Sequence, residues 1–464
     1  MASQSDLPSA GSPSPMDLCA LPATEMARMV RLRLVSPVEL VQAHLDRIAL
    51  TEPVIRAFQA IRAEAALSEA KALADSAGLG ELPLAGVPLA VKDDIDVAGE
   101  PTRRGSAATP ATPAARDDLL VSKLKQAGCI VIGKSQLPEL AIWPFTEPAA
   151  FAATRNPWIT ERTPGGSTGG GAAAVVSGMA ALALGSDGGG SLRIPAACCG
   201  AFGFKPGRGV VPLGGDGRPR WLGLIEYGPI ARTVADAALM LDVLSGKNSF
   251  RDPQPLENPI SIAFSDKHPF PGAKATDRVR AELRYATAML RNTGHSLLED
   301  NPPYPASLGL RFLTRWLKGI AEDAAGLEAN LLEPRTQRMV KAGRFLGRRA
   351  KPAAADPYGR QLAPLFARYE ALLTPTLTSG PPPVGTWEGV GWFKTTLGVA
   401  RWVYTAPWSL AGLPCASLPF GHDNDGLPIG IQLVGPPGGD LRLLSLAAQI
   451  EQLRPWPRLA PHPA

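Results

Sequence analysis

The sequence predicts an α/β fold with a mixed central sheet flanked by helices. Two observations predict it: short apolar runs bounded by turn-forming residues alternate with longer segments of helical periodicity, and no repeat or interdomain linker interrupts them. The 464 residues, 45% hydrophobic and 19% charged, supply enough apolar surface for one large core. We therefore expect a single domain over residues 16–464, preceded by a flexible tail, residues 1–15, rich in Ser, Pro, Gly and Ala.

The first half of the chain carries four clear local signals. Residues 36–39, Ser-Pro-Val-Glu, form a capping box with proline at the first helical position and predict a helix start. The apolar run at residues 86–91 predicts a buried strand. Residues 117–126 predict a helix closed by Gly128, and residues 129–132 predict the next strand.

The second half repeats this alternation. Residues 233–244 predict a helix with Gly246 as its left-handed C-terminal residue. Residues 260–264 predict a strand, and residues 277–292 predict a helix. Two loops are expected inside the domain, at residues 352–356 and 379–385.

Charge and cysteine content argue against several classes of protein. The net charge of +5 is modest for this length, and the one dense basic cluster, at residues 335–351, is interpreted as a solvated helix face and turn. No nucleic-acid partner is therefore expected. The five cysteines are an odd number without C-x-x-C spacing or neighbouring histidines. This argues against a disulfide framework or a zinc site and suits a reducing compartment.

Targeting signals are not recognised either. Residues 1–15 lack the basic and apolar segments of a secretory signal. No apolar run approaches the roughly 18 residues of a membrane span. We expect a cytoplasmic monomer or homodimer with no membrane partner, no metal and no cofactor.

Two motifs match known patterns but lack the surroundings that those patterns need. Residues 128–135 satisfy G-x-x-x-x-G-K-[ST], yet their four x positions are the predicted strand, where a phosphate cradle needs a flexible loop. Residues 165–169 satisfy G-x-S-x-G, but a loop precedes them where a nucleophile elbow needs a strand. A histidine base is also disfavoured, although His422 beside Asp423 is the hardest to dismiss. We expect all five histidines to be structural or solvated: His44, His268, His295, His422 and His462.

The chemistry is expected in a dense glycine–serine region at residues 164–207. Three consecutive glycines, residues 188–190, precede Ser191, and ordering them is costly unless their N–H groups must face one point. Such an array stabilises an oxyanion by about 3–4 kcal/mol per donor and would make Ser191 a nucleophile; a plain glycine-rich turn is the alternative. A lysine whose pKa is depressed by burial can replace histidine as the base. Lys92 ends the strand at 86–91, although lysines in that position are more often surface residues.

These segments resemble the amidase signature family. The resemblance is carried by residues 86–93, 155–158, 164–170, 188–196, 199–200, 203–206, 228–233, 373–376 and 426–435. It extends from about residue 20 to a C-terminal helix near residue 450. It implies the α/β fold of that family in one amidase-signature domain.

The resemblance also implies a Ser–cis-Ser–Lys triad, mapped by motif onto Ser191, Ser167 and Lys92. By that analogy, Ser191 attacks the carbonyl carbon and forms an acyl-enzyme, while Ser167 relays its proton to neutral Lys92 and back to the leaving amine. The Gly166–Ser167 peptide is expected to be cis. The other expected site residues are Gly188, Gly189 and Gly190 with Ser191 as oxyanion donors, and Thr168, Asp187 and Arg193 as supporting residues.

The expected substrate is a small hydrophobic amide or anilide, with esters and carbamates (urethanes) chemically close. An aromatic-rich stretch suggests an apolar pocket, although part of it could be core. Its members are Trp387, Trp392, Phe393, Trp402, Tyr404 and Trp408. Ser409 stands where relatives often carry asparagine.

A second interpretation keeps the triad but assigns the chain a different reaction, that of the glutamine-hydrolysing A-type subunit of a tRNA-dependent amidotransferase. The tyrosine-rich stretch of that protein is missing, because residues 341–373 hold only Tyr358 and Tyr369. A binding protein without catalysis is disfavoured by the complete triad.

Overall fold

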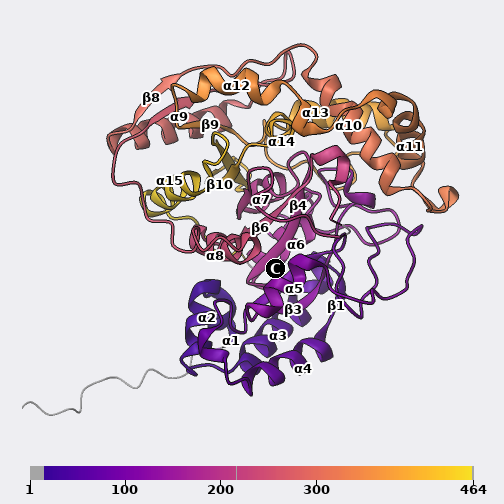
Figure 1. Ribbon diagram of the computed structural model, residues 1–464, viewed down its shortest axis with the longest axis vertical. Helices are drawn as coiled ribbons and strands as arrows, with labels where there is room; N and C mark the ends of the chain where they lie inside the picture. The colour runs from indigo at the N-terminus through magenta and orange to yellow at the C-terminus, as the bar shows by residue number, and fades with distance from the viewer. Residues whose placement is uncertain (1–14, 216, 462–464) are drawn as a thin grey trace, which may run out of the picture.

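The computed structural model of the protein describes residues 15–215 and 217–461 (Figure 1). Within them, eleven strands form one sheet in the order β1-β3-β2-β4-β6-β5-β10-β11-β9-β7-β8. The strands are β1 (Phe58–Ile61), β2 (Pro88–Lys92), β3 (Ile130–Ser135), β4 (Leu182–Asp187), β5 (Phe202–Lys205), β6 (Glu226–Ala231), β7 (Ser261–Phe264), β8 (Ser296–Glu299), β9 (Ala371–Pro375), β10 (Cys415–His422) and β11 (Pro428–Val434).

Helices surround this sheet, with α1–α4 at one end of the long axis and α10–α13 at the other (Figure 1). They are α1 (Pro15–Ala20), α2 (Ala23–Arg31), α3 (Pro37–Ile55), α4 (Ala63–Ala74), α5 (Leu119–Gln126), α6 (Gly169–Val176), α7 (Arg193–Cys199), α8 (Val234–Ser245), α9 (Asp277–Asn292), α10 (Leu308–Asp323), α11 (Pro334–Leu346), α12 (Tyr358–Phe366), α13 (Trp392–Trp402), α14 (Ala406–Ala411) and α15 (Asp440–Leu453).

The sheet is mixed. β2 is parallel to β3 and β4, and β7 is parallel to β8 and β9. The six strands from β4 to β9 across the middle pair antiparallel. The predicted α/β fold, a mixed central sheet flanked by helices, is confirmed.

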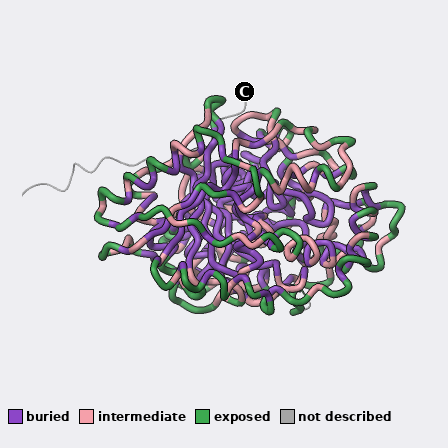
Figure 2. Tube along the Cα trace, turned by 90° about the horizontal axis from the view of Figure 1, so that it is seen from above, coloured by how far each residue is buried: buried purple, intermediate pink, exposed green. Residues whose placement is uncertain are grey.

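Both faces of β2, β3 and β4 are buried because alternate side chains enter two separate hydrophobic cores. On β2, Leu89 and Val91 belong to one core and Ala90 to the other. The core containing Ala90 also takes up α6, every residue of which is buried. A Cβ added at Gly171 would lie 3.0 Å from Ala183 of β4, so small residues let this helix approach the sheet closely. Figure 2 shows the buried trace gathered at the centre.

The local sequence signals predicted many of these elements to within a few residues. Ser36 Oγ accepts from the Glu39 N–H and the Glu39 carboxylate accepts from the Ser36 N–H, so the capping box of α3 is confirmed. Helix α9 has the predicted bounds, and Gly246 ends α8 with φ +68°. The predicted loop at 352–356 is wrong in part, because residues 353–355 form a turn of 3₁₀ helix.

Strand β3 is longer than predicted and includes the end of the phosphate-loop match. It runs through Ser135, so the Gly-Lys-Ser segment lies inside the sheet. Lys134 Nζ contacts Asp93 at 2.9 Å, and both side chains are fully buried. This segment therefore forms no phosphate cradle.

The predicted tail falls mostly outside the described residues. Residues 1–14 are not among them, and Pro15 begins α1. Among the helices of the described chain, none has the length and apolar character needed to cross a membrane. The basic cluster lies on α11 and the turn after it, largely exposed as predicted. Arg335 is the exception, because its guanidinium lies 5.5 Å from the ring centres of Trp143 and Phe145.

Candidate active site

The carboxyl ends of two paired strands bring the predicted base to the glycine–serine region. β2 ends at Lys92 and β4 ends at Asp187, and parallel pairing places these ends at the same edge of the sheet. Ser167 precedes α6, and Ser191 precedes α7. The topology thus gathers residues that are far apart in the sequence.

Lys92 is fully buried and bonded to Ser167. Lys92 Nζ donates to Ser167 Oγ and to Ser186 Oγ, each at 2.8 Å, and contacts the Ser186 carbonyl oxygen at 3.4 Å. The Gly166–Ser167 peptide is cis, as the resemblance implied. A Cβ at position 166 would lie 2.7 Å from the Phe145 nitrogen, so only glycine fits there without a backbone shift.

The surroundings of Lys92 disfavour its charged form. Removal from water disfavours the ammonium form and lowers the pKa of Lys92 from 10.5 to about 8. The charge of Asp94 opposes this shift, Arg220 reinforces it, and Asp187 opposes it again. A neutral amine, able to accept a proton, is therefore accessible under mild conditions.

Ser191 is half-buried and borders a cavity. The Thr168 N–H donates to the Ser191 carbonyl oxygen at 3.2 Å, so the loop that carries Ser167 lies beside the loop that carries Ser191. Within residues 15–215 and 217–461, no hydrogen bond joins Ser167 Oγ directly to Ser191 Oγ. Thr168 Oγ1 contacts the Ser186 carbonyl at 3.5 Å and so points toward β4.

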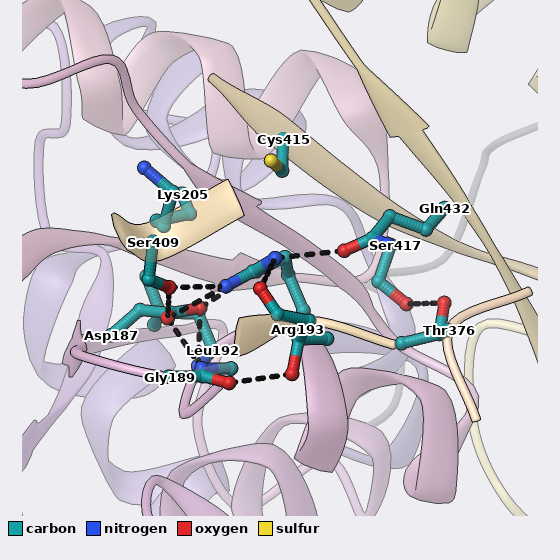
Figure 3. A network of polar contacts seen from close by, with 12 residues as sticks. Asp187, Gly189, Leu192, Arg193, Lys205, Thr376, Ser409, Cys415, Ser417 and Gln432 are labelled. Atoms are coloured by element: carbon teal, nitrogen blue, oxygen red, sulfur yellow. Dashed lines mark hydrogen bonds and ion pairs between the residues drawn. The ribbon is translucent and has the colours of Figure 1, made fainter. Parts of the chain in front are cut away.

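A buried ion pair between Asp187 and Arg193 holds the glycine loop, residues 187–193 (Figure 3). Arg193 Nε and Nη2 each donate to the Asp187 carboxylate at 2.9 Å, and both side chains are fully buried. The same carboxylate accepts the N–H groups of Gly190 at 2.6 Å and Leu192 at 3.3 Å. Burial alone raises the pKa of Asp187, but the charge and hydrogen bonds of Arg193 outweigh it and lower that pKa below 3.8.

These bonds change the role expected of Gly190. Its N–H is used by Asp187 and is not free to donate to an oxyanion, contrary to the prediction. The backbone at Gly190 has φ +136°, and a Cβ there would overlap Thr405 Oγ1. Gly190 therefore shapes the loop. The N–H groups that remain as candidate oxyanion donors are those of Gly188, Gly189 and Ser191.

Polar residues from the C-terminal part of the chain contact Arg193 and the loop (Figure 3). Arg193 donates to the Gln432 side chain at 2.8 Å, to the Thr405 carbonyl at 3.0 Å and to Ser409 Oγ at 2.8 Å. Thr405 Oγ1 donates to the Gly189 carbonyl at 2.5 Å. Ser409 thus stabilises Arg193, and sequence reasoning gave Thr405 no role.

An apolar cavity of about 310 Å³ opens beside Ser191. Helices α10 and α13 form much of its wall, together with residues 141–144 and 406–407. Among the residues that the structure describes, no Asp, Glu, Lys, Arg or His lines it. Its aromatic members are Trp143, Trp221, Phe270, Phe312, Trp316, Trp392 and Phe393. The cavity suits an apolar group attached to a carbonyl at Ser191.

The aromatic-rich stretch contributes to this cavity only in part. Trp392 and Phe393 line it. Trp408 and Tyr404 are fully buried instead, and Trp387 and Trp402 border a separate, more polar cavity. The lining aromatics missed by sequence reasoning come from segments far apart in the chain: Trp143, Trp221, Phe270, Phe312 and Trp316.

The described histidines take structural positions, and none of them lines the cavity. Burial lowers the pKa of His44 and of His268 to about 4. The ring of His422 packs against Trp158, with 5.1 Å between centres. His462 lies outside the described residues. In the described part of the chain, no group of three or more His, Cys, Asp or Glu is placed to hold a metal ion.

Comparisons with known proteins agree with this geometry. The family model Amidase matches residues 39–444. AmiB2 of Mycobacterium tuberculosis, an amidase by name, is 41% identical over 461 residues, covering 96% of this chain and 99% of that protein. The A-type subunit of the glutamyl-tRNA(Gln) amidotransferase of Synechococcus is 34% identical, covering 90% and 93%. The solved structure of 6-aminohexanoate cyclic dimer hydrolase with substrate has a TM-score of 0.84 at 29% identity, covering 96% and 99%.

Proposed function

Since the chain belongs to the amidase signature family and is an amide-hydrolysing enzyme, we propose that it cleaves small hydrophobic amides or anilides through Ser191, Ser167 and Lys92. The observation that carries the proposal is the 2.8 Å bond from buried Lys92 to Ser167, beside an apolar cavity that Ser191 borders. Esters and carbamates are secondary candidates, because attack on them needs the same groups.

In the proposed acylation, Ser191 Oγ bonds to the carbonyl carbon as its proton passes to Ser167 Oγ and the Ser167 proton passes to neutral Lys92. The N–H groups of Gly188, Gly189 and Ser191 take the negative oxygen. When the C–N bond breaks, the amine nitrogen takes a proton from Ser167, which regains one from the Lys92 ammonium. Water then cleaves the acyl-enzyme by the same relay and releases the acid.

The character of the cavity supports an apolar substrate over glutamine. Free glutamine carries an ammonium and a carboxylate, and charges taken out of water need partners that no side chain lining this cavity supplies. An alkyl or aryl group needs no such partner when it leaves water for this cavity. The amidotransferase interpretation therefore remains the weaker one, and the amidotransferase relative is also more distant than AmiB2.

A substrate panel tests the proposal. Purified protein is assayed on anilides of increasing acyl length, on matched esters and carbamates, and on glutamine. We expect the rate to rise with apolar acyl size, glutamine to stay near background, and Ser191→Ala to abolish turnover while His422→Ala retains it. Glutamine as the best substrate, or full activity in Ser191→Ala, would contradict the proposal.

A further inference from the structure

A chain of buried polar contacts continues from Lys92 away from the serines. Ser186 Oγ accepts from Lys92 Nζ at 2.8 Å and donates to Asp94 Oδ2 at 3.1 Å. Asp94 Oδ2 itself lies 4.0 Å from Lys92 Nζ, and its side chain is 1% exposed. None of these contacts has a part in the proton relay described above.

Arg220, in the 3₁₀ turn Arg220–Gly223, anchors this chain at its far end. Its guanidinium spans two carboxylates, Asp94 at 3.2 Å and Asp323 at 3.1 Å. Asp323 is the last residue of α10 and also accepts from the indole of Trp221 at 2.7 Å. Because Trp221 and α10 line the cavity, Arg220 links the cavity wall to the surroundings of Lys92.

We propose that Asp94 and Arg220 are positioning residues for the proposed base Lys92: Asp94 orients the Ser186 hydroxyl, and Arg220 holds Asp94 in place. A serine hydroxyl has one hydrogen. With that hydrogen directed to Asp94, the oxygen can only accept from Lys92. The Ser186 hydroxyl and carbonyl oxygens then take two N–H groups of the neutral amine, which leaves its lone pair for Ser167. This inference rests on the proposed function.

The two charges also act on Lys92 in opposite directions. Asp94 stabilises the ammonium form and Arg220 destabilises it. Of the other titratable groups nearby, Asp187 on β4 favours the ammonium of Lys92. Arg104 acts on Asp94, and Asp323 and Tyr227 of β6 act on Arg220. On the β3 side, Asp93 is paired with Lys134 at 2.9 Å. Neutralising Asp94 and neutralising Arg220 should therefore move the titration of Lys92 in opposite senses.

The experiment compares Asp94→Asn, Arg220→Gln and the wild type by the pH dependence of Ser191 phosphonylation with a fluorophosphonate. In that reaction Ser191 Oγ bonds to phosphorus, fluoride leaves, and the serine proton passes through Ser167 to Lys92. The rate rises as Lys92 loses its proton. We expect the rising limb of the curve of phosphonylation rate against pH to move to lower pH by about one unit in Asp94→Asn. In Arg220→Gln it should move to higher pH by about one unit.

The controls separate positioning from general damage. Glu282 is a buried carboxylate on α9 that pairs with Arg454 at 3.0 Å and with Arg278 at 2.6 Å, so Glu282→Gln should lower stability without moving the rising part of the pH–rate curve. Arg220→Lys keeps the charge and should restore the wild-type limb. If Asp94→Asn does not fold, the shift in Arg220→Gln alone decides. Limbs that stay in place or move in the same direction would overturn the inference, whereas a wild type whose Ser191 is not labelled would overturn the proposed function.

Discussion

The loop at residues 187–193 and the cavity wall beside it are built from different interactions. The loop is held by an ion pair at 0% exposure and by hydrogen bonds that use each Asp187 oxygen at least twice. The cavity wall consists of apolar side chains from α10, α13 and segments distant in the sequence. One of them, Phe393, is 64% exposed. The first arrangement fixes atoms to one geometry, whereas the second tolerates different shapes.

This difference separates chemistry from recognition. A buried polar network is stable only when all its partners are satisfied, so damage at one point affects the whole loop. Apolar contacts are individually small and add up, so a change in the wall removes a share of the binding energy. Substitutions in the loop should therefore lower activity on every substrate, and substitutions in the wall should change which substrates are preferred.

The largest effect is expected from Asp187→Asn, which leaves the Arg193 charge buried without its partner. Removing one member of a buried pair costs about 3–5 kcal/mol in the free energy of unfolding, measured by urea denaturation. Turnover of all substrates should be lost with it. The double variant Asp187→Leu/Arg193→Met should recover only the part of the stability that the unpaired Arg193 charge removes, and none of the activity, because the N–H groups of Gly190 and Leu192 stay without a partner. A stable, active Asp187→Asn would show that the network does not hold the loop.

Gly190→Ala tests the shape of the loop without touching a charge. The backbone there has φ +136°, and the new Cβ would overlap Thr405, so the loop must shift. The shift would move the neighbouring N–H groups of Gly189 and Ser191, and loss of one such oxyanion donor lowers kcat by about 100- to 1000-fold. Steady-state kinetics on a short and a long acyl amide should show the same loss. A loss confined to the long substrate would mean that Gly190 belongs to recognition.

The pH profile offers a third test, because the proposed base, Lys92, belongs to the chemistry and not to substrate recognition. Burial lowers the pKa of Lys92 to about 8, and only the neutral amine can accept a proton. The value of kcat/KM should therefore fall about tenfold for each pH unit below about 8 and level off above it. The limb should be the same for every substrate. Limbs that differ among substrates would assign the titration to another group.

The same comparison explains what the sequence could predict. The proposed serines Ser167 and Ser191 lie with Asp187 and Arg193 in short glycine-rich segments, and their motifs resemble those of the amidase signature family. Lys92, at the end of an apolar strand, was assigned its role by the same resemblance. The same reasoning assigned Gly190 as an oxyanion donor, because spacing does not tell which N–H groups the loop itself consumes. The sequence does not predict a role for Asp94, because only the fold brings Ser186 and Arg220 into contact with it.

The cavity was harder to predict because any large apolar residue can serve in a core or in a wall. Trp408 and Trp392 lie in one aromatic-rich stretch, yet the first is core and the second lines the cavity. Trp143 and Trp316 are far apart in the sequence and meet edge-on, with 5.6 Å between ring centres. Local periodicity predicted helices and strands well, but which apolar faces are left open depends on how α10 and α13 pack.

Phe312→Ala tests recognition directly. A Cβ at Gly189 would lie 2.9 Å from the Phe312 ring, so this side chain borders the glycine loop. Loss of its apolar contact with the substrate should cost about 1.5–3 kcal/mol of binding, a decrease in kcat/KM of about 10- to 150-fold on large apolar amides. A short acetyl amide should be affected much less. Leu310→Ala is the control, because Leu310 lies on the same helix, 61% exposed and outside the cavity lining.

The smallest effect is expected from Gly309→Ala, which makes in the cavity wall the same change that Gly190→Ala makes in the loop. Gly309 lines the cavity in the first turn of α10, and a Cβ there would meet nothing within 4 Å. The added methyl group changes substrate binding by at most about 0.8 kcal/mol, so KM should change by no more than about fourfold while kcat stays the same. If Gly309→Ala lowered kcat as much as Gly190→Ala, the wall would share the rigidity of the loop, and the separation between chemistry and recognition would fail.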